Sequence, residues 1–208
     1  MSADADAAVA AAVAALRAGE LVVFPTETLY GVGCDALNPR AMERLVAVKQ
    51  RGADKGVAVL VADVAMLELV TDDVGEGARR LAAAFWPGPL TILFRARPGL
   101  PEPLVVDGRI GARVSSHPLA QRLTRELGRP LAAPSANPAG REPAHDVDTA
   151  RRYFGDAVAC YLDGGTIAGP PSTLADPGPP LRVLREGAVA RAAIEDALRR
   201  ADATTPSP

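Results

Sequence analysis

Hydrophobic positions along this chain follow two spacings, one typical of helices and the other typical of buried strands. Val9, Val13 and Leu16 recur at helical spacing ahead of Gly19, and short apolar runs bounded by Pro or Gly predict strands. The predicted helices cover residues 9–16, 39–49, 79–85, 119–127, 146–154 and 190–200, and the predicted strands cover 21–24, 57–61, 90–94, 110–114, 131–133, 158–162 and 181–184.

The order of these elements favours an α/β fold of α+β-like character, in which helices pack on a mixed sheet. Several strands follow one another without an intervening helix, whereas a regular doubly wound sheet places a helix between its parallel strands. Ile110, Ala112 and Val114 alternate along the chain, which predicts a strand buried on one face only. We expect residues 1–200 to form a single domain and residues 201–208 a loose tail.

Composition excludes several classes of protein. The net charge is −2, so a strongly basic nucleic-acid surface is not the dominant character of the chain. Two cysteines and two histidines are too few for a disulfide framework or a metal site built on those residues. The longest apolar run, residues 7–16, is far shorter than the roughly 20 residues that cross a bilayer. We therefore expect a cytoplasmic protein that does not associate with membranes.

Three pairs of polar residues lie two positions apart at element boundaries marked by Pro or Gly. In an extended chain such neighbours point to the same side, so each pair could present two polar groups to one cavity. The structural alternative stays open for each pair, since cations suit a helix end and Ser, Thr and Asn often cap turns. The pairs are Thr26 with Thr28, Lys49 with Arg51, and Ser135 with Asn137.

Other familiar motifs give no function. The segment 31–36 matches a dinucleotide fingerprint, but six residues separate it from its strand and the helix signal comes later. The chain has no P-loop sequence. We interpret Cys34 as a buried, inert thiol, and His117 and His145 as turn or surface residues rather than general bases.

Several motifs in a fixed order resemble the YrdC/TsaC family, the threonylcarbamoyl-adenylate synthases, in its short single-domain form. The resemblance runs from about residue 10 to residue 190. The motifs are residues 24–33, 49–51, 85–91, 112–114, 117–118, 133–137, 172–173 and 185–187.

The resemblance implies that the chain condenses L-threonine, bicarbonate and ATP into threonylcarbamoyl-AMP and pyrophosphate. This product serves the N6-threonylcarbamoyladenosine modification of tRNA by a partner transferase complex. The implied fold is a twisted mixed sheet, flanked by helices, around a basic cavity that can also bind tRNA weakly. Mg²⁺ would accompany ATP, and no protein side chain is predicted as a metal ligand.

The resemblance also implies a set of site residues, with Arg113 binding the threonine carboxylate through its planar fork of donors. Where the family often has Pro and His, this chain has Gly52 and Leu60. Lys49 and Arg51 are the implied catalytic residues. The implied ATP-binding residues are Lys49, Arg51, Lys55, Ser135, Asn137 and Arg185, and the implied threonine-binding residues are Thr28, Arg113 and Ser172.

Two alternative functions remain beside this one. A non-catalytic RNA-binding module would use the basic cavity, although an aromatic content of 4% offers few side chains for base stacking. A related carbamoyl-adenylate enzyme, like the multidomain hydrogenase-maturation proteins, would carry additional segments. A purely structural partner is disfavoured, because polar motifs are concentrated at a few element boundaries.

Overall fold

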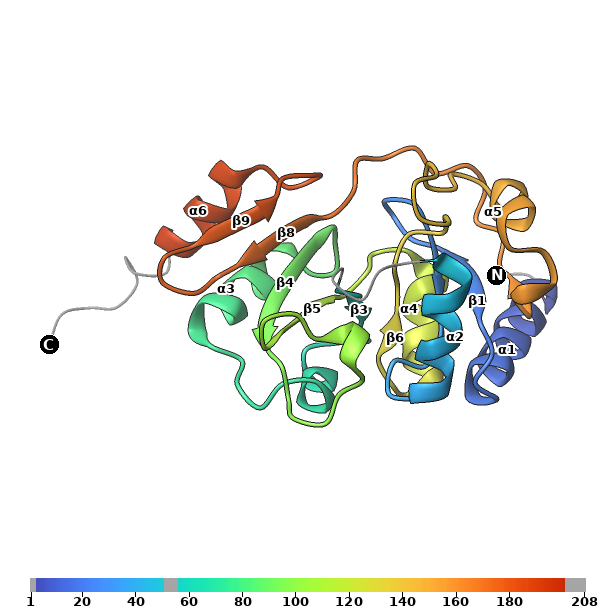
Figure 1. The fold of residues 1–208 in the computed structure, drawn as a ribbon. Coiled ribbons are helices and arrows are strands. Elements are labelled where there is room, and N and C mark those ends of the chain that lie inside the picture. Colours follow the sequence, from blue (N-terminus) through green and yellow to red (C-terminus); the bar gives the residue numbers. More distant parts are fainter. Residues whose placement is uncertain (1–2, 51–55, 201–208) are drawn as a thin grey trace, which may run out of the picture.

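A computed structural model describes residues 3–50 and 56–200 of the chain (Figure 1). The helices are α1 (Ala3–Arg17), α2 (Pro39–Lys49), α3 (Glu76–Phe85), α4 (Pro118–Leu127), α5 (Val147–Phe154) and α6 (Arg191–Arg200), with short 3₁₀ turns at Ala65–Leu69, Glu102–Leu104 and Gly155–Ala157. The strands are β1 (Val22–Pro25), β2 (Tyr30–Gly33), β3 (Val59–Leu60), β4 (Leu90–Arg95), β5 (Arg109–Arg113), β6 (Leu131–Ala132), β7 (Cys160–Tyr161), β8 (Thr173–Asp176) and β9 (Arg182–Arg185).

The strands form two mixed sheets that continue into one another. One has the order β2-β1-β7 and the other β6-β3-β5-β4-β8-β9, with parallel pairs in both. The junction runs between β2 and β6, where the Val32 amide donates to the Pro134 carbonyl at 3.1 Å and the Ala132 amide donates to the Cys34 carbonyl at 2.9 Å. The predicted mixed sheet is therefore confirmed.

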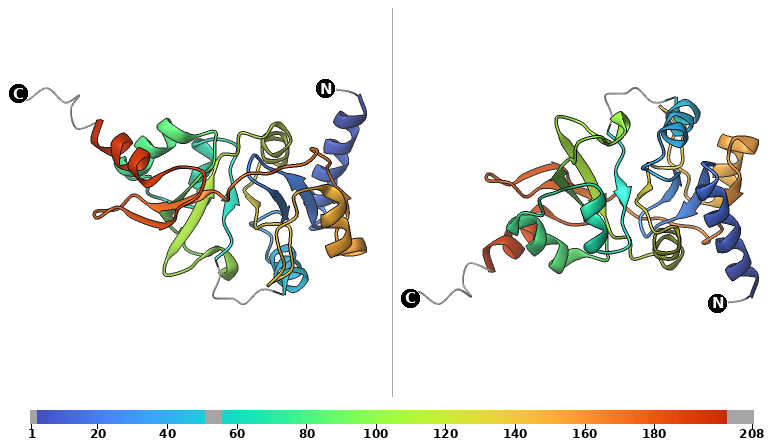
Figure 2. Two further views of the ribbon diagram at one scale, coloured as in Figure 1. Left: turned by 90° about the horizontal axis from the view of Figure 1, so that it is seen from above. Right: turned by 90° about the horizontal axis from the view of Figure 1, so that it is seen from below.

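Each of the two sheets, with the helices that pack on it, forms one half of the molecule. Helix α1 packs against α4 and β1, and α3 packs against α6 and β4. Figure 2 shows the blue and orange helices α1 and α5 at one end of the molecule and the red and green helices α6 and α3 at the other. Within the described part of the chain, no helix is both long and apolar enough to cross a membrane.

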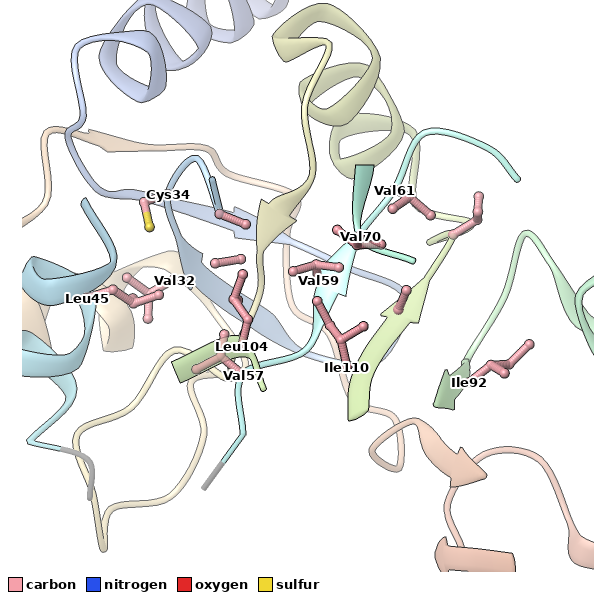
Figure 3. Packing of buried hydrophobic residues seen from close by; sticks show 14 of the residues in the cluster. Val32, Cys34, Leu45, Val57, Val59, Val61, Val70, Ile92, Leu104 and Ile110 are labelled. Carbon is pink, nitrogen blue, oxygen red and sulfur yellow. The ribbon is translucent and has the colours of Figure 1, made fainter. Parts of the chain in front are cut away.

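The main hydrophobic core lies along the junction of the two sheets. Val32 and Leu45 from the first half meet Val59 and Ile110 from the second half in one buried cluster (Figure 3). Burying apolar side chains stabilises the fold by about 25 cal/mol per Å² of surface removed from water. The core thus fixes the position of one half relative to the other, and with it the loops that come from each.

Most predicted elements are present, but the prediction for the strand around residue 112 is wrong in one respect. Residues 110–113 of β5 are all buried, so the strand is not exposed on one face. The reason is that the second face carries Gly111, which lies against Thr91 and Ala58, and Arg113, which is buried beside a cavity described below. The sequence patterns also missed β2 and β8. The predicted tail at residues 201–208 lies outside the described residues.

Gly33 allows the close contact between β2 and β6, and its substitution should destabilise the fold. A Cβ atom at this position would lie 1.8 Å from the Ala132 carbonyl oxygen, so the strands would have to separate. We expect Gly33→Ala to lower the free energy of unfolding by about 3 kcal/mol, measured by urea denaturation. Gly75→Ala is the control, because a Cβ there meets nothing within 4 Å, and it should cost less than about 1 kcal/mol. Equal losses for the two variants would contradict this account.

Candidate active site

A cavity of about 280 Å³ lies where polar loops from both halves of the molecule meet. Five predicted site residues line it, and each comes from a different segment: the loop after β1, the end of β5, the segment after β6, the residue before β8 and the end of β9. The connection from β7 to β8 crosses between the two sheets and brings in the fourth of these (Figure 1). The five residues are Thr28, Arg113, Ser135, Ser172 and Arg185.

Arg113 is the buried cation of this cavity. Its side chain is 8% exposed, and its Nη1 donates to Oε1 of Glu27, whose other oxygen accepts from the Ser115 hydroxyl. Burial lowers the pKa of the Arg113 guanidinium from its ordinary value, the Glu27 carboxylate acts in the opposite direction, and repulsion from Arg185 lowers the pKa further. The two guanidinium groups therefore act on each other across the same cavity.

Two further donors of Arg113, Nε and Nη2, have no acceptor among the described residues. Within that part of the chain, no buried side-chain nitrogen lacks a partner. These two atoms must therefore reach solvent, and Arg113 lines the cavity. An Nε and Nη2 edge is the geometry that holds a carboxylate by two parallel hydrogen bonds.

Arg185 and Ser172 form a connected part of the cavity wall. Arg185 donates to the Ser172 carbonyl from Nε at 3.1 Å and from Nη2 at 2.9 Å, and the Ser172 and Thr91 hydroxyls lie 3.0 Å apart. Partial burial lowers the pKa of Arg185. Gly187 permits this packing, because a Cβ there would lie 2.0 Å from the Pro171 carbonyl oxygen.

Of the pair Thr26 and Thr28, Thr28 lines the cavity and Thr26 does not, so the expectation that both would face one cavity is not met. The hydroxyls of Thr26 and Thr28 lie 3.0 Å apart, and both residues are buried. The Thr26 hydroxyl also donates to the Leu29 carbonyl at 2.7 Å, which fixes the turn after β1. Thr28 therefore lines the cavity from a rigid turn, and the capping interpretation holds for Thr26.

Ser135, Asn137 and Lys49 form a connected group at the cavity wall. The Ser135 hydroxyl donates to the Asn137 side-chain oxygen at 2.6 Å, and the Asn137 amide donates to the Arg141 carbonyl at 2.6 Å. The buried Lys49 donates from Nζ to the Ser135 carbonyl and, at 2.7 Å, to the Asn137 carbonyl. Lys49 thus holds the segment that carries Ser135, and its predicted role in binding ATP stays a prediction.

Some further expectations concern residues that the structure describes, and others do not. Arg51, Lys55 and Gly52 lie outside the described residues. Leu60, which stands where the family often has His, is buried and lines the cavity. Cys34 is fully buried, and burial raises the pKa of its thiol to about 12, as expected of an inert cysteine.

The two histidines occupy structural positions. His117 caps the N-terminus of α4, where its Nδ1 accepts from the Leu119 amide, and burial lowers the pKa of its imidazole. His145 is exposed and its Nδ1 lies 2.7 Å from the Ile167 carbonyl oxygen. Within the described ranges, no group of three or more His, Cys, Asp or Glu side chains could hold a metal ion.

Two site residues escaped the sequence analysis. Glu27 contacts the predicted residue Arg113, and Thr91 contacts the predicted residue Ser172. The only local signal was their presence inside two of the motifs, at residues 24–33 and 85–91. Their partners lie far away in sequence.

Comparisons with known proteins identify the family of this chain. A profile of the Sua5/YciO/YrdC family, described as "Telomere recombination", matches residues 14–187. A protein of Mycobacterium tuberculosis (strain ATCC 25618 / H37Rv) is 42% identical over 195 residues, which cover 91% of this chain and 88% of that protein. The threonylcarbamoyl-AMP synthase of Idiomarina loihiensis is 37% identical over 160 residues, which cover 75% of this chain and 85% of that enzyme.

A solved structure agrees with the sequence matches. The crystal structure of P. abyssi Sua5 complexed with L-threonine has a TM-score of 0.87 and 33% sequence identity to this chain. The similarity covers 91% of this chain and 56% of Sua5, so this chain spans little more than half of that protein. The chain belongs to the Sua5/YciO/YrdC family.

Proposed function

We propose that this chain is a threonylcarbamoyl-AMP synthase, which makes threonylcarbamoyl-AMP and pyrophosphate from L-threonine, bicarbonate and ATP. The observation that carries the proposal is the convergence of Arg113 and Arg185 on one cavity of about 280 Å³ lined by hydroxyl groups. A threonine carboxylate and a polyphosphate are both anionic and both favour guanidinium donors. The named activity of the Idiomarina loihiensis relative supports the same substrate set.

The residues that line the cavity suit the two substrates. Arg113 binds the threonine carboxylate through Nε and Nη2, and the hydroxyls of Thr28 and Ser172 bind the polar groups of the amino acid. Ser135 and Arg185 bind ATP from the other walls, together with Asn137 and Lys49, which hold the segment around Ser135. Arg51 and Lys55, outside the described residues, complete the proposed ATP site.

The reaction needs no protein nucleophile. The threonine amine and bicarbonate form a carbamate with loss of water. A carbamate oxygen then attacks the α-phosphorus of ATP, the bond from that phosphorus to the bridging oxygen breaks, and pyrophosphate leaves. The protein contributes by aligning the reactants and stabilising the negative charge that develops on the phosphate oxygens. The described lining residues suit these tasks, since they include two arginines and several hydroxyls.

Mg²⁺ belongs to the substrate side of this proposal. It enters bound to the phosphates of ATP and neutralises part of the charge on the departing pyrophosphate. The two guanidinium groups of the cavity wall are donors with no acceptor capacity, and they suit phosphate oxygens rather than a metal ion.

The product also defines the proposed partners. Threonylcarbamoyl-AMP is an activated acyl donor, and a cytoplasmic transferase complex would move its threonylcarbamoyl group to an adenosine of tRNA. Weak direct binding of tRNA by this chain is part of the same proposal.

A pyrophosphate-release assay tests the function. Purified chain with ATP, Mg²⁺ and bicarbonate should release pyrophosphate when L-threonine is added, and omission of either threonine or bicarbonate should abolish the release. Release that ignores threonine would contradict the proposal. Filter binding of tRNA at several salt concentrations separates the alternative, since tight, salt-sensitive binding without pyrophosphate release would favour an RNA-binding module.

A further inference from the structure

We propose that Glu27 is a positioning residue, which orients the Arg113 guanidinium toward the threonine carboxylate. This role rests on the proposed function. Glu27 lies between the two threonines of the turn after β1, and its side chain extends to Arg113 instead of following their hydroxyls.

The Glu27 carboxylate has both of its oxygens engaged. Oε1 accepts from Nη1 of Arg113, and Oε2 accepts from the Ser115 hydroxyl. Ser115 is itself held, because its Oγ accepts from the His117 amide at 3.2 Å and its carbonyl accepts from Gln121 of α4 at 3.0 Å. The carboxylate is therefore tied to the start of a helix, and through it Arg113 is tied to the same point.

This contact decides which edge of the guanidinium faces the ligand. With Nη1 committed to Glu27, the Nε and Nη2 edge is the one left for the cavity, which is the edge that can hold a carboxylate by two hydrogen bonds. Arginine loses much rotamer freedom when it is fixed. Because Glu27 fixes the Arg113 side chain before threonine binds, the entropy cost of ordering that side chain does not weaken threonine binding.

A second effect of Glu27 would weaken threonine binding. Its negative charge repels the threonine carboxylate, so removing it could strengthen binding. The guanidinium lies between the two carboxylates in this arrangement, and Glu27 is within hydrogen-bond distance of Arg113 while the substrate would bind on the other edge. Coulomb repulsion falls with separation, so we infer that orientation outweighs repulsion.

Variants of Glu27 and Ser115 separate the two effects. We expect Glu27→Ala to raise the threonine KM about tenfold or more, since a charge-assisted contact of this kind shifts an equilibrium by at least that factor. Glu27→Gln, whose amide oxygen can still accept from Arg113, should give a smaller rise. Ser115→Ala, which leaves the ion pair in place, should raise it about threefold. The ATP KM and the kcat at saturating threonine should change by less than about twofold in all three.

A double-mutant cycle tests whether Glu27 acts through Arg113. In an Arg113→Ala background, Glu27→Ala should add less than about twofold to the loss of threonine affinity, measured by calorimetric titration with threonine. Glu43→Gln, an exposed carboxylate change on α2, is the matched control and should leave every parameter unchanged. A threonine KM that falls or stays constant in Glu27→Ala would overturn the positioning role, as would an undiminished effect without Arg113.

The experiment also distinguishes this role from the proposed function. Urea denaturation of each variant identifies a folding defect, and Ser115→Ala and Glu27→Gln keep the test decisive if Glu27→Ala does not fold. If wild-type chain binds threonine but releases no pyrophosphate, the proposed function fails while the titrations still decide the role of Glu27.

Discussion

Replacing Arg113 by alanine is expected to raise the threonine KM at least about a hundredfold, because two charge-assisted hydrogen bonds to the carboxylate are lost together. Arg113 is buried and lines the cavity, and neither its Nε nor its Nη2 has an acceptor among the described residues. Steady-state pyrophosphate release at varied threonine measures the effect. The ATP KM should change far less, since ATP is held from other walls.

Two further variants test whether the effect depends on the guanidinium geometry and on this position. Arg113→Lys keeps the charge but replaces the planar fork by a single ammonium, so we expect it to raise the threonine KM about tenfold. Arg95→Ala removes an exposed arginine of β4 and should leave the KM unchanged. A normal threonine KM in Arg113→Ala would remove Arg113 from the threonine site.

Replacing Lys49 should have the second largest effect, and it should act on ATP. The chain has two lysines against 21 arginines, and one of them is the buried residue whose Nζ donates to the Ser135 and Asn137 carbonyls. A compact ammonium suits two converging carbonyls better than a planar guanidinium does. We therefore expect both Lys49→Met and Lys49→Arg to lower kcat/KM for ATP by about ten- to a hundredfold.

The same substitution should lower stability, because Lys49→Met removes the buried ammonium that links the Ser135 and Asn137 carbonyls. The Ser135 carbonyl keeps a second donor, the Asn137 backbone amide at 2.9 Å. The free energy of unfolding should fall by about 2 kcal/mol in urea denaturation. Arg40→Met, an exposed change on the same helix, controls for loss of charge and should alter neither quantity. If Lys49→Met retained normal stability and normal kcat/KM for ATP, the account of the segment 135–137 would be wrong.

Local sequence patterns predicted the helices whose ends are marked by a capping residue or a glycine. Asn38 accepts from the Ala41 amide at the start of α2, and Gly128 ends α4 with φ 70°, as their positions in the sequence indicated. Strand β2 escaped prediction because Tyr30–Gly33 contains two glycines and gains its place from pairing with β1 and β6. The burial of both faces of β5 likewise depends on neighbours that are distant in sequence.

The sequence likewise predicted part of the site, namely residues that line it, but not the contacts that hold these residues in place. Five residues predicted from the motifs line one cavity, so the motifs correctly predicted a group of residues that lie together. The contacts that position these residues were not predictable, because Glu27 meets Arg113 across 86 residues and Lys49 meets Asn137 across 88. Such pairs have no periodicity or spacing that a single sequence reveals, and only the packed sheets bring them together.

Transfer of labelled carbon from bicarbonate into an adenylate tests the central claim most directly, since it requires threonine, bicarbonate and ATP to meet in one cavity. Wild-type chain incubated with isotopically labelled bicarbonate, L-threonine and ATP should form an adenylate that contains the label, threonine and AMP in equal amounts, detected by mass spectrometry. Arg113→Ala should form little of it at the same threonine concentration. An unlabelled adenylate, or full labelling without threonine, would contradict the account.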